Sequence, residues 1–386
     1  MNRRHFLLNA SAAAAAAAAA MFPASRTFAA RPPGSRPTSR SATKPWDDVP
    51  ADAVWHDVRD WGVEGRGFDD TAAYFDRFPA RAKDLVRPDV WNLSRHTSGM
   101  SARFETDSPG IYARYELTKP ELAMPHMPAT GVSGVDIYAK LDDKPWRWFG
   151  VTHPASPQVV GALGSNLAPG RRAYVVNLPL YNGVKSLEIG VQGGAGFWPT
   201  PPRKDKAILF YGTSITQGGC ASRPGMSFVN LLGRRLDRPV LNFGFSGNGR
   251  FELEVGRLLA ELDPAIFVID CVANTTPEQI AQRTPPLVKL LRDAHPKTPI
   301  LLLDERTWET APLMPNVAKL HAEKSAALTQ AYDALIAENV QNLTFRKADD
   351  VLGVDGEATV DGSHPNDLGM MRYAEALEPD LRKLLA

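Results

Sequence analysis

The chain has 386 residues, of which 44% are hydrophobic and 23% charged, a composition typical of globular protein with room for about two domains. Lys and Arg together number 44 and Asp and Glu number 43, so the formal net charge is +1 at pH 7. A charge this close to zero gives no electrostatic basis for binding nucleic acid or an anionic membrane surface, and we predict neither partner.

The first thirty residues have the composition of an export signal. Arg3 and Arg4 stand ahead of three apolar residues and an unbroken alanine run at 12–20. The arginine pair is typical of a twin-arginine signal, and the apolar stretch is too short to span a bilayer. We predict a signal peptide over 1–30, with an alanine-rich structural helix as the alternative, and a flexible Pro- and Ser-rich linker over 31–45. The protein is then periplasmic or secreted, without stable membrane insertion.

Between residues 46 and 200 the hydrophobic pattern has a period of two. Short runs rich in β-branched and aromatic residues are separated by turn signals such as Asn182-Gly183. The runs are 101–106, 111–117, 135–140, 146–151, 173–178 and 184–191. This spacing predicts an antiparallel β-sandwich domain of the jelly-roll kind, with Trp146 and Trp148 on one face and a linker over 193–205.

After residue 205 strand-like runs alternate with helical stretches, which predicts a parallel sheet covered on both faces. The strands are expected at 207–211, 240–243, 266–270, 300–304 and 343–346, and the helices at 226–236, 251–262, 277–293, 316–339 and the end of the chain. We therefore predict a flavodoxin-like three-layer α/β/α domain over 205–386. Functional groups should follow the carboxyl ends of its strands.

Those strand ends carry the side chains of a nucleophilic hydrolase. Ser214 follows the first strand, Asn274 the third, and Asp361 and His364 the fifth. A serine hydroxyl needs a base to take its proton, histidine suits that task near neutral pH, and a carboxylate can hold the ring in the required tautomer. A single Gly-x-Ser is a weak signal, and an isolated D-x-x-H is more often a helix cap or a metal ligand. Their joint placement favours a hydrolase.

Three motifs carry a resemblance to a known family: G-T-S-I-T-Q-G-G-C-A-S-R-P-G-M at 212–226, N-F-G-F-S-G-N-G at 242–249 and D-G-S-H-P-N at 361–366. With them, residues 207–386 resemble the SGNH hydrolases, or GDSL esterases. The preceding region, with M-P-H-M-P-A-T-G-V-S-G-V-D-I-Y at 124–138, is similar to the G-x-D-L-Y domain of one bacterial branch. The aspartate of G-D-S is replaced by Thr213, and G-x-N-D reads Val272-Ala273-Asn274-Thr275.

The resemblance implies a role for each matching residue. Ser214 would be the nucleophile, His364 the general base and Asp361 its orienting carboxylate. The oxyanion hole would consist of the backbone amide of Ser214, Gly247 and the amide side chain of Asn274.

These roles predict an exported serine esterase that removes short O-acyl groups, acetyl above all, from a saccharide or another small ester substrate. The alternatives are a lipase or thioesterase, and a non-catalytic glycan-binding protein on the same scaffold. The histidines lack metal-ligand spacing and two cysteines cannot complete a zinc tetrad, so no metal site and no cofactor are predicted. The oligomeric state does not follow from the sequence.

Other residues are weaker candidates. Arg306 and Trp308 follow the fourth strand and would border the acyl pocket, unless they belong to a salt-bridged structural loop. His126 would border the active site, or serve as a structural histidine. Cys220 and Cys271, the only cysteines, follow neighbouring strands at the same sheet edge, and export permits oxidation. We predict a disulfide between them, with two buried free thiols as the alternative.

Overall fold

The computed structural model describes residues 49–142 and 144–386. The predicted signal peptide, 1–30, and the predicted linker, 31–45, lie outside the described residues. The described residues form three sheets, of which one is parallel and two are antiparallel.

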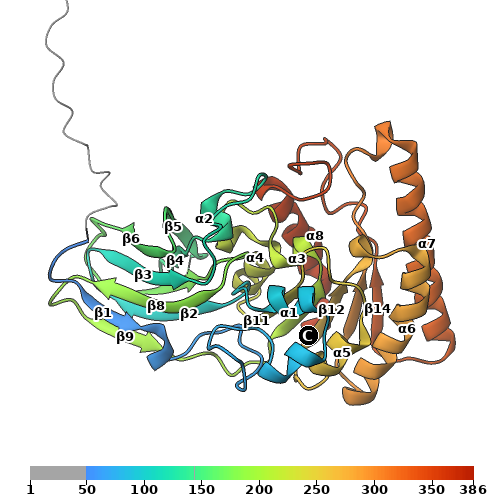
Figure 1. The fold of residues 1–386 in the computed structure, drawn as a ribbon, viewed down its shortest axis with the longest axis horizontal. Helices are drawn as coiled ribbons and strands as arrows, with labels where there is room; N and C mark the ends of the chain where they lie inside the picture. Colours follow the sequence, from blue (N-terminus) through green and yellow to red (C-terminus); the bar gives the residue numbers. More distant parts are fainter. Residues whose placement is uncertain (1–48, 143) are drawn as a thin grey trace, which may run out of the picture. The chain divides into compact units, whose positions relative to one another are not determined.

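The parallel sheet has five strands in the order β11-β10-β12-β13-β14. Figure 1 labels β11, β12 and β14. They are β10 (Ile208–Gly212), β11 (Val240–Gly244), β12 (Ile266–Asp270), β13 (Ile300–Leu303) and β14 (Leu343–Arg346). Every residue of the first four is buried, as expected of continuous apolar strands with both faces covered. Gly212 pairs in register with Gly244 and with Asp270, so the chain leaves these three strands at one level of one edge.

Helices cover both faces of this sheet, which confirms the predicted α/β/α layers. The helices of this part are α3 (Ser214–Gln217), α4 (Phe228–Arg235), α5 (Leu253–Leu259), α6 (Pro277–Ala294), α7 (Pro315–Ala337) and α8 (Asp367–Leu385), with 3-10 turns at Pro224–Met226, Val272–Asn274 and Ala311–Leu313. Side chains of α5, α6 and α7 share a core with Leu209 and Tyr211, whereas those of α4 and α8 pack with Ile208 and Phe210. Alternate residues of a strand point to opposite faces, which separates the two cores.

The N-terminal part is β-rich and antiparallel, as predicted. One sheet has the order β1-β8-β3-β6 and the other β5-β4-β7-β2-β9. The strands are β1 (Val54–Asp57), β2 (Ser101–Thr106), β3 (Ile111–Leu117), β4 (Asp136–Ala139), β5 (Arg147–Val151), β6 (Gln158–Gly164), β7 (Arg172–Asn177), β8 (Val184–Val191) and β9 (Phe197–Thr200). Three of them, β1, β6 and β9, were not predicted, and β9 lies within the expected linker.

A segment ahead of β2 joins the two parts of the protein. It contains the helix α1 (Pro88–Ser94) and a 3-10 turn at Ala80–Asp84; further short helical turns lie at Val58–Asp60 and α2 (Ala129–Val132). Phe78 stacks on Phe243 of β11, with ring centroids 5.2 Å apart. The fully buried guanidinium of Arg77 donates to the carbonyls of Asn242 and Gly244 at 2.7 and 2.9 Å. The parallel sheet is thus partly covered by the chain between β1 and β2.

Candidate active site

Ser214 begins α3 directly after β10, at the carboxyl edge of the parallel sheet. Its side chain is almost buried, and its Oγ lies 2.8 Å from Nε2 of His364. The turn into α3 is tight, because a Cβ on Gly212 would lie 2.1 Å from Oγ1 of Thr216 and 2.7 Å from the carbonyl oxygen of Asp270. The glycine therefore lets the chain turn sharply and present the hydroxyl.

His364 is held by Asp361 in the loop between β14 and α8. Its Nδ1 lies 2.8 Å from Asp361 Oδ2, and its backbone N–H donates to Asp361 Oδ1 at 2.7 Å. Burial raises the pKa of Asp361, but hydrogen bonds from the backbone and ring of His364 and from Ser363 outweigh it and leave that pKa below its ordinary value. An ionised Asp361 accepts Nδ1–H, so Nε2 carries the lone pair that faces Ser214.

The loop that carries His364 is fixed by Arg306. The guanidinium, 3% exposed, donates through Nε and Nη2 to the carbonyl of Ser363 at 3.2 and 3.1 Å and through Nη1 to Glu305 at 3.0 Å. Trp308 donates its Nε1–H to the same Glu305 carboxylate at 2.7 Å. The predicted pocket residues Arg306 and Trp308 thus belong to a salt-bridged loop, the alternative that the sequence left open, and Arg306 faces protein groups.

The predicted oxyanion donors follow β11 and β12. Gly247 is exposed with a φ of +69°, a conformation that favours glycine, and no atom lies within 4 Å of where its Cβ would stand. Asn274 ends the 3-10 turn after β12, and its buried Nδ2 has no hydrogen-bond partner among the described residues. An unmet buried donor costs about 1–3 kcal/mol, which an incoming oxygen would recover.

Asp270, the last residue of β12, is a buried titratable group that the sequence did not single out. It is buried and accepts a hydrogen bond from Thr216 Oγ1 at 2.8 Å. Burial raises its pKa to about 7, against the opposing effects of that hydrogen bond and of Arg306. Its position at a strand end was the only sequence signal for it.

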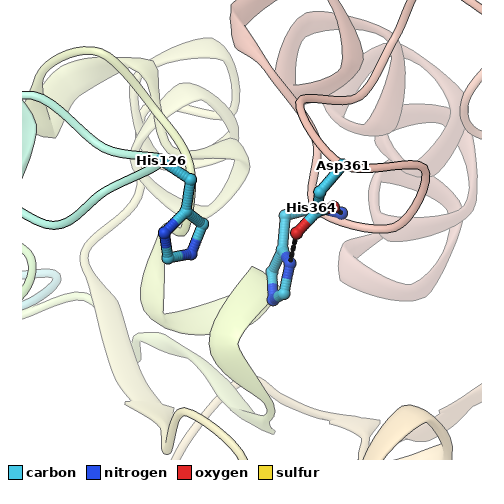
Figure 2. A group of neighbouring side chains, drawn as sticks. All are labelled: His126, Asp361 and His364. Atoms are coloured by element: carbon cyan, nitrogen blue, oxygen red, sulfur yellow. Dashed lines mark hydrogen bonds and ion pairs between the residues drawn. The ribbon is translucent and has the colours of Figure 1, made fainter.

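His126, which the sequence left as either an active-site neighbour or a structural histidine, lies beside His364. It is at the tip of a turn closed by backbone hydrogen bonds between Met124 and Met127. The two imidazole rings meet edge to face with centroids 5.7 Å apart (Figure 2). Ligand atoms of His126, Asp361 and His364 all lie within 4.8 Å of one another, a grouping that could hold a divalent cation and that the sequence spacing did not reveal.

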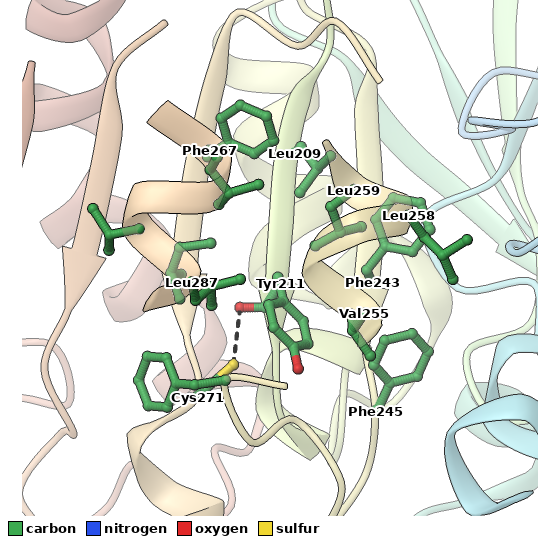
Figure 3. Packing of buried hydrophobic residues seen from close by; sticks show 14 of the residues in the cluster. Leu209, Tyr211, Phe243, Phe245, Val255, Leu258, Leu259, Phe267, Cys271 and Leu287 are labelled. Atoms are coloured by element: carbon green, nitrogen blue, oxygen red, sulfur yellow. Dashed lines mark hydrogen bonds between the residues drawn. The ribbon is translucent and has the colours of Figure 1, made fainter. Parts of the chain in front are cut away.

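The predicted disulfide is wrong, because Cys220 and Cys271 are both free and buried. Cys271 belongs to the core with Leu209 and Tyr211, where its Sγ lies 3.6 Å from the carbonyl oxygen of Tyr211 (Figure 3). Cys220 belongs to the core on the opposite face of the sheet. Both cysteines follow neighbouring strands and therefore lie near one edge of the sheet. Their thiols nevertheless lie on opposite faces, with the sheet between them.

Comparisons with known proteins agree with this geometry. The model of the GDSL-like Lipase/Acylhydrolase family matches residues 205–382, and the model for the N-terminus of Esterase_SGNH_hydro-type proteins, GxDLY, matches residues 53–197. A solved structure described as a GDSL-like lipase from Bacteroides ovatus is 33% identical, with a TM-score of 0.82 over 86% of this chain and 98% of that one. The chain therefore belongs to the GDSL-like, or SGNH, hydrolase family, and it is a carboxylic ester hydrolase.

Two more distant structures share the fold. Salicylyl-acyltransferase SsfX3 from a tetracycline biosynthetic pathway is 19% identical, with a TM-score of 0.68 over 87% of this chain and 98% of that one. A family two carbohydrate esterase from Cellvibrio japonicus is 15% identical, with a TM-score of 0.55 over 86% and 98%. A comparison with curated protein sequences finds no significant match. Among the helices of the described ranges, none is long and apolar enough to cross a membrane.

Proposed function

We propose that the protein removes acetyl or other short acyl groups from saccharide esters, with Ser214, His364 and Asp361 as its catalytic residues. The observation that carries this proposal is the continuous pair of contacts from Ser214 Oγ to His364 Nε2 and from His364 Nδ1 to Asp361, each of 2.8 Å. A shared likeness of fold with a carbohydrate esterase supports the saccharide as substrate.

The first half of the reaction acylates Ser214. His364 Nε2 accepts the proton of Ser214 Oγ–H as Oγ forms a bond to the ester carbonyl carbon. The negative oxygen that develops receives hydrogen bonds from the backbone N–H groups of Ser214 and Gly247 and from Nδ2 of Asn274. As the intermediate collapses, the bond between the carbonyl carbon and the sugar oxygen breaks, and His364 gives its proton to that oxygen.

The second half releases the acid. His364 Nε2 takes a proton from water as the water oxygen attacks the acyl carbon, and the same donors bind the second oxyanion. The bond to Ser214 Oγ then breaks, Oγ recovers the proton from His364, and the carboxylic acid leaves. Asp361 stays ionised throughout and stabilises the transient imidazolium.

The domain and location assignments belong to this proposal. A β-sandwich domain over 46–200 precedes the hydrolase domain, 205–386, and the two family matches fall inside these bounds. The predicted twin-arginine signal would place the enzyme in the periplasm or outside the cell. Replacing Arg3 and Arg4 by Lys should then retain the full-length chain in the cytoplasm.

Acetate release from acetylated polysaccharides tests the proposed function. We expect release by the wild-type protein and none above background by Ser214→Ala. A series of nitrophenyl esters should show turnover falling as the acyl chain lengthens beyond a few carbons. Preference for long acyl chains would instead identify a lipase, and saccharide binding with no turnover of any ester would identify a glycan-binding protein.

A further inference from the structure

A pocket opens beside the oxyanion loop, by which we mean the turn at 246–248 after β11. This side pocket has a volume of about 470 Å³, within the range of small-molecule sites. Its polar wall comes from α1, from the strand-free segment after β3 and from the two neighbours of Gly247: Asp89, Asn92, Lys119, Glu121, Ser246 and Asn248. Tyr181 also lines it, and its hydroxyl donates to the backbone carbonyl of Ser214 at 3.0 Å, so the wall of the side pocket contacts the chain at the proposed nucleophile.

A buried chain of hydrogen bonds connects this pocket with the helix of the nucleophile. Lys119 Nζ lies 2.5 Å from Nε2 of His96, and Nδ1 of His96 lies 2.9 Å from Nε2 of Gln217. Gln217 is the last residue of α3, which Ser214 begins, and its Oε1 accepts the backbone N–H of Ser246 at 3.0 Å. His96 and Gln217 are 3% and 0% exposed, so water does not replace these contacts.

Two backbone groups fix the orientation of the Gln217 amide. Ser246 N–H can only donate, so the atom that faces it must be the amide oxygen. The carbonyl of Leu180 can only accept, and it receives a hydrogen bond from Gln217 Nε2 at 3.1 Å. Rotating the amide would set donor against donor and acceptor against acceptor. Gln217 therefore presents an N–H to His96.

This orientation determines the protonation of the next two residues. His96 Nδ1 accepts from Gln217, so the neutral ring carries its proton on Nε2 and donates it toward Lys119. Only an uncharged amine has a lone pair to accept that proton. Burial lowers the pKa of Lys119, against the charge of Glu121. Burial also keeps the pKa of His96 well below its ordinary value, and a positive charge on Lys119 or on Arg77 lowers it further. The Tyr181 ring, 6.2 Å from that of His96, and Asp89 complete these surroundings.

We propose that the uncharged amine of Lys119 binds the alcohol part of the ester in the side pocket, and that this pocket selects a neutral saccharide over an anionic one. The inference rests on the proposed function and names its substrate class. The Lys119 lone pair is used by His96, so its two N–H groups remain for hydroxyl or ring oxygens. Asn92 adds an amide that suits the same partners, whereas the amide of Asn248 already bonds Arg87 and the carbonyl of Ser246.

The charge balance of the pocket supports a neutral ligand. If Lys119 is uncharged, none of the residues that line the side pocket offers a cation to the carboxylates of Asp89 and Glu121. Arg87 comes within 3.9 Å of Asp89, but it pairs more closely with Glu252, at 2.5 Å. A uronic acid or phosphate group in this pocket would therefore meet unbalanced negative charge.

The test compares three esters with the same acetyl group: p-nitrophenyl acetate, an acetylated xylo-oligosaccharide and an acetylated oligogalacturonide. We expect wild-type kcat/KM to be at least tenfold higher for the neutral than for the anionic saccharide. Lys119→Met keeps the stem and removes the amine; we expect it to raise KM for the xylo-oligosaccharide about tenfold more than KM for p-nitrophenyl acetate. Lys185→Met, at an exposed lysine of β8 paired with Glu116, should change neither.

The charge state is measured separately, by trace acetylation of Ser214→Ala with acetic anhydride and mass spectrometry over a range of pH. Lys119 should become reactive at a lower pH than Lys185. Equal reactivity profiles, equal use of both saccharides, or equal KM changes for all esters would overturn the inference. The proposed function fails by a different result, turnover of p-nitrophenyl acetate that survives in Ser214→Ala.

Discussion

The imidazole of His126 lies edge to face against that of His364, although the two residues belong to different parts of the fold. His126 comes from the turn between β3 and α2, and His364 from the loop ahead of α8. The N-terminal region thus places a side chain beside the proposed general base. Because His364 already contacts Ser214 and Asp361, anything that binds its ring competes with that arrangement.

Zinc should therefore inhibit the enzyme. A cation held by His126, Asp361 and His364 would occupy groups that the serine and its base need free. We expect micromolar Zn²⁺ to abolish turnover of p-nitrophenyl acetate and a chelator to restore it. His126→Ala should weaken inhibition by about tenfold or more, whereas His153→Ala should leave it as in the wild type. Inhibition unchanged in His126→Ala would place the ion elsewhere.

Loss of the nucleophile should abolish turnover without unfolding the protein. The hydroxyl of Ser214 contacts His364 and contributes little packing, so Ser214→Ala should melt within a few degrees of the wild type. We expect its kcat for p-nitrophenyl acetate to fall by a factor of about 10⁴ or more. Ser156→Ala, at an exposed serine, is the matched control and should retain wild-type kcat. Activity retained by Ser214→Ala would refute the mechanism.

Asn274→Ala should lower the activity without lowering the stability of the protein. Removing an oxyanion donor lowers kcat by roughly 10²–10³. Its Nδ2 is buried and unpaired, so Asn274→Ala removes an unmet donor and should leave the free energy of unfolding unchanged or slightly higher. Steady-state kinetics and denaturant unfolding of the same preparation measure both. A clear loss of stability would mean that Asn274 is a structural residue.

Asp270 should make the protein less stable as the pH rises. Its pKa is about 7 in the folded protein against an ordinary value of 3.8, so the folded state holds more protons between these values. The contribution of Asp270 to the free energy of unfolding is then highest below about pH 4. It falls as the pH rises from there through pH 7, by at most about 4 kcal/mol. Asp270→Asn carries no charge at any pH. Unfolding curves of the two proteins should therefore converge at low pH and separate at high pH; parallel curves would contradict the assignment.

The cysteines should titrate as thiols. Both are buried and free, and burial raises the pKa of Cys220 to about 12, so neither should react in the folded protein. The protein unfolded without reductant should give two reactive thiols, and reductant should not change the thermal midpoint. A midpoint that drops on reduction, together with no reactive thiol, would restore the disulfide.

The sequence by itself determined the α/β/α layers and the grouping of Ser214, His364 and Asp361. The five parallel strands were predicted to within two residues at each end, because a strand buried on both faces is a continuous apolar run that few other structures share. Parallel strands also bring their carboxyl ends to one edge, so Ser214, Asn274 and His364 could be grouped from chain position alone. Strands β1, β6 and β9 were not predicted, because the alternation of apolar and polar residues in them is short or interrupted.

Only the tertiary structure decided what depends on faces and on distant partners. The chain positions of Cys220 and Cys271 place both residues at the same edge of the sheet. The face on which each thiol lies depends on the turn between the end of the strand and the cysteine. Lys119, His96 and Gln217 belong to no common motif, and they meet because α1 and the segment after β3 close over the oxyanion loop. The pKa shifts of Lys119 and Asp270 likewise follow from burial and from neighbouring groups, which no local stretch of sequence contains.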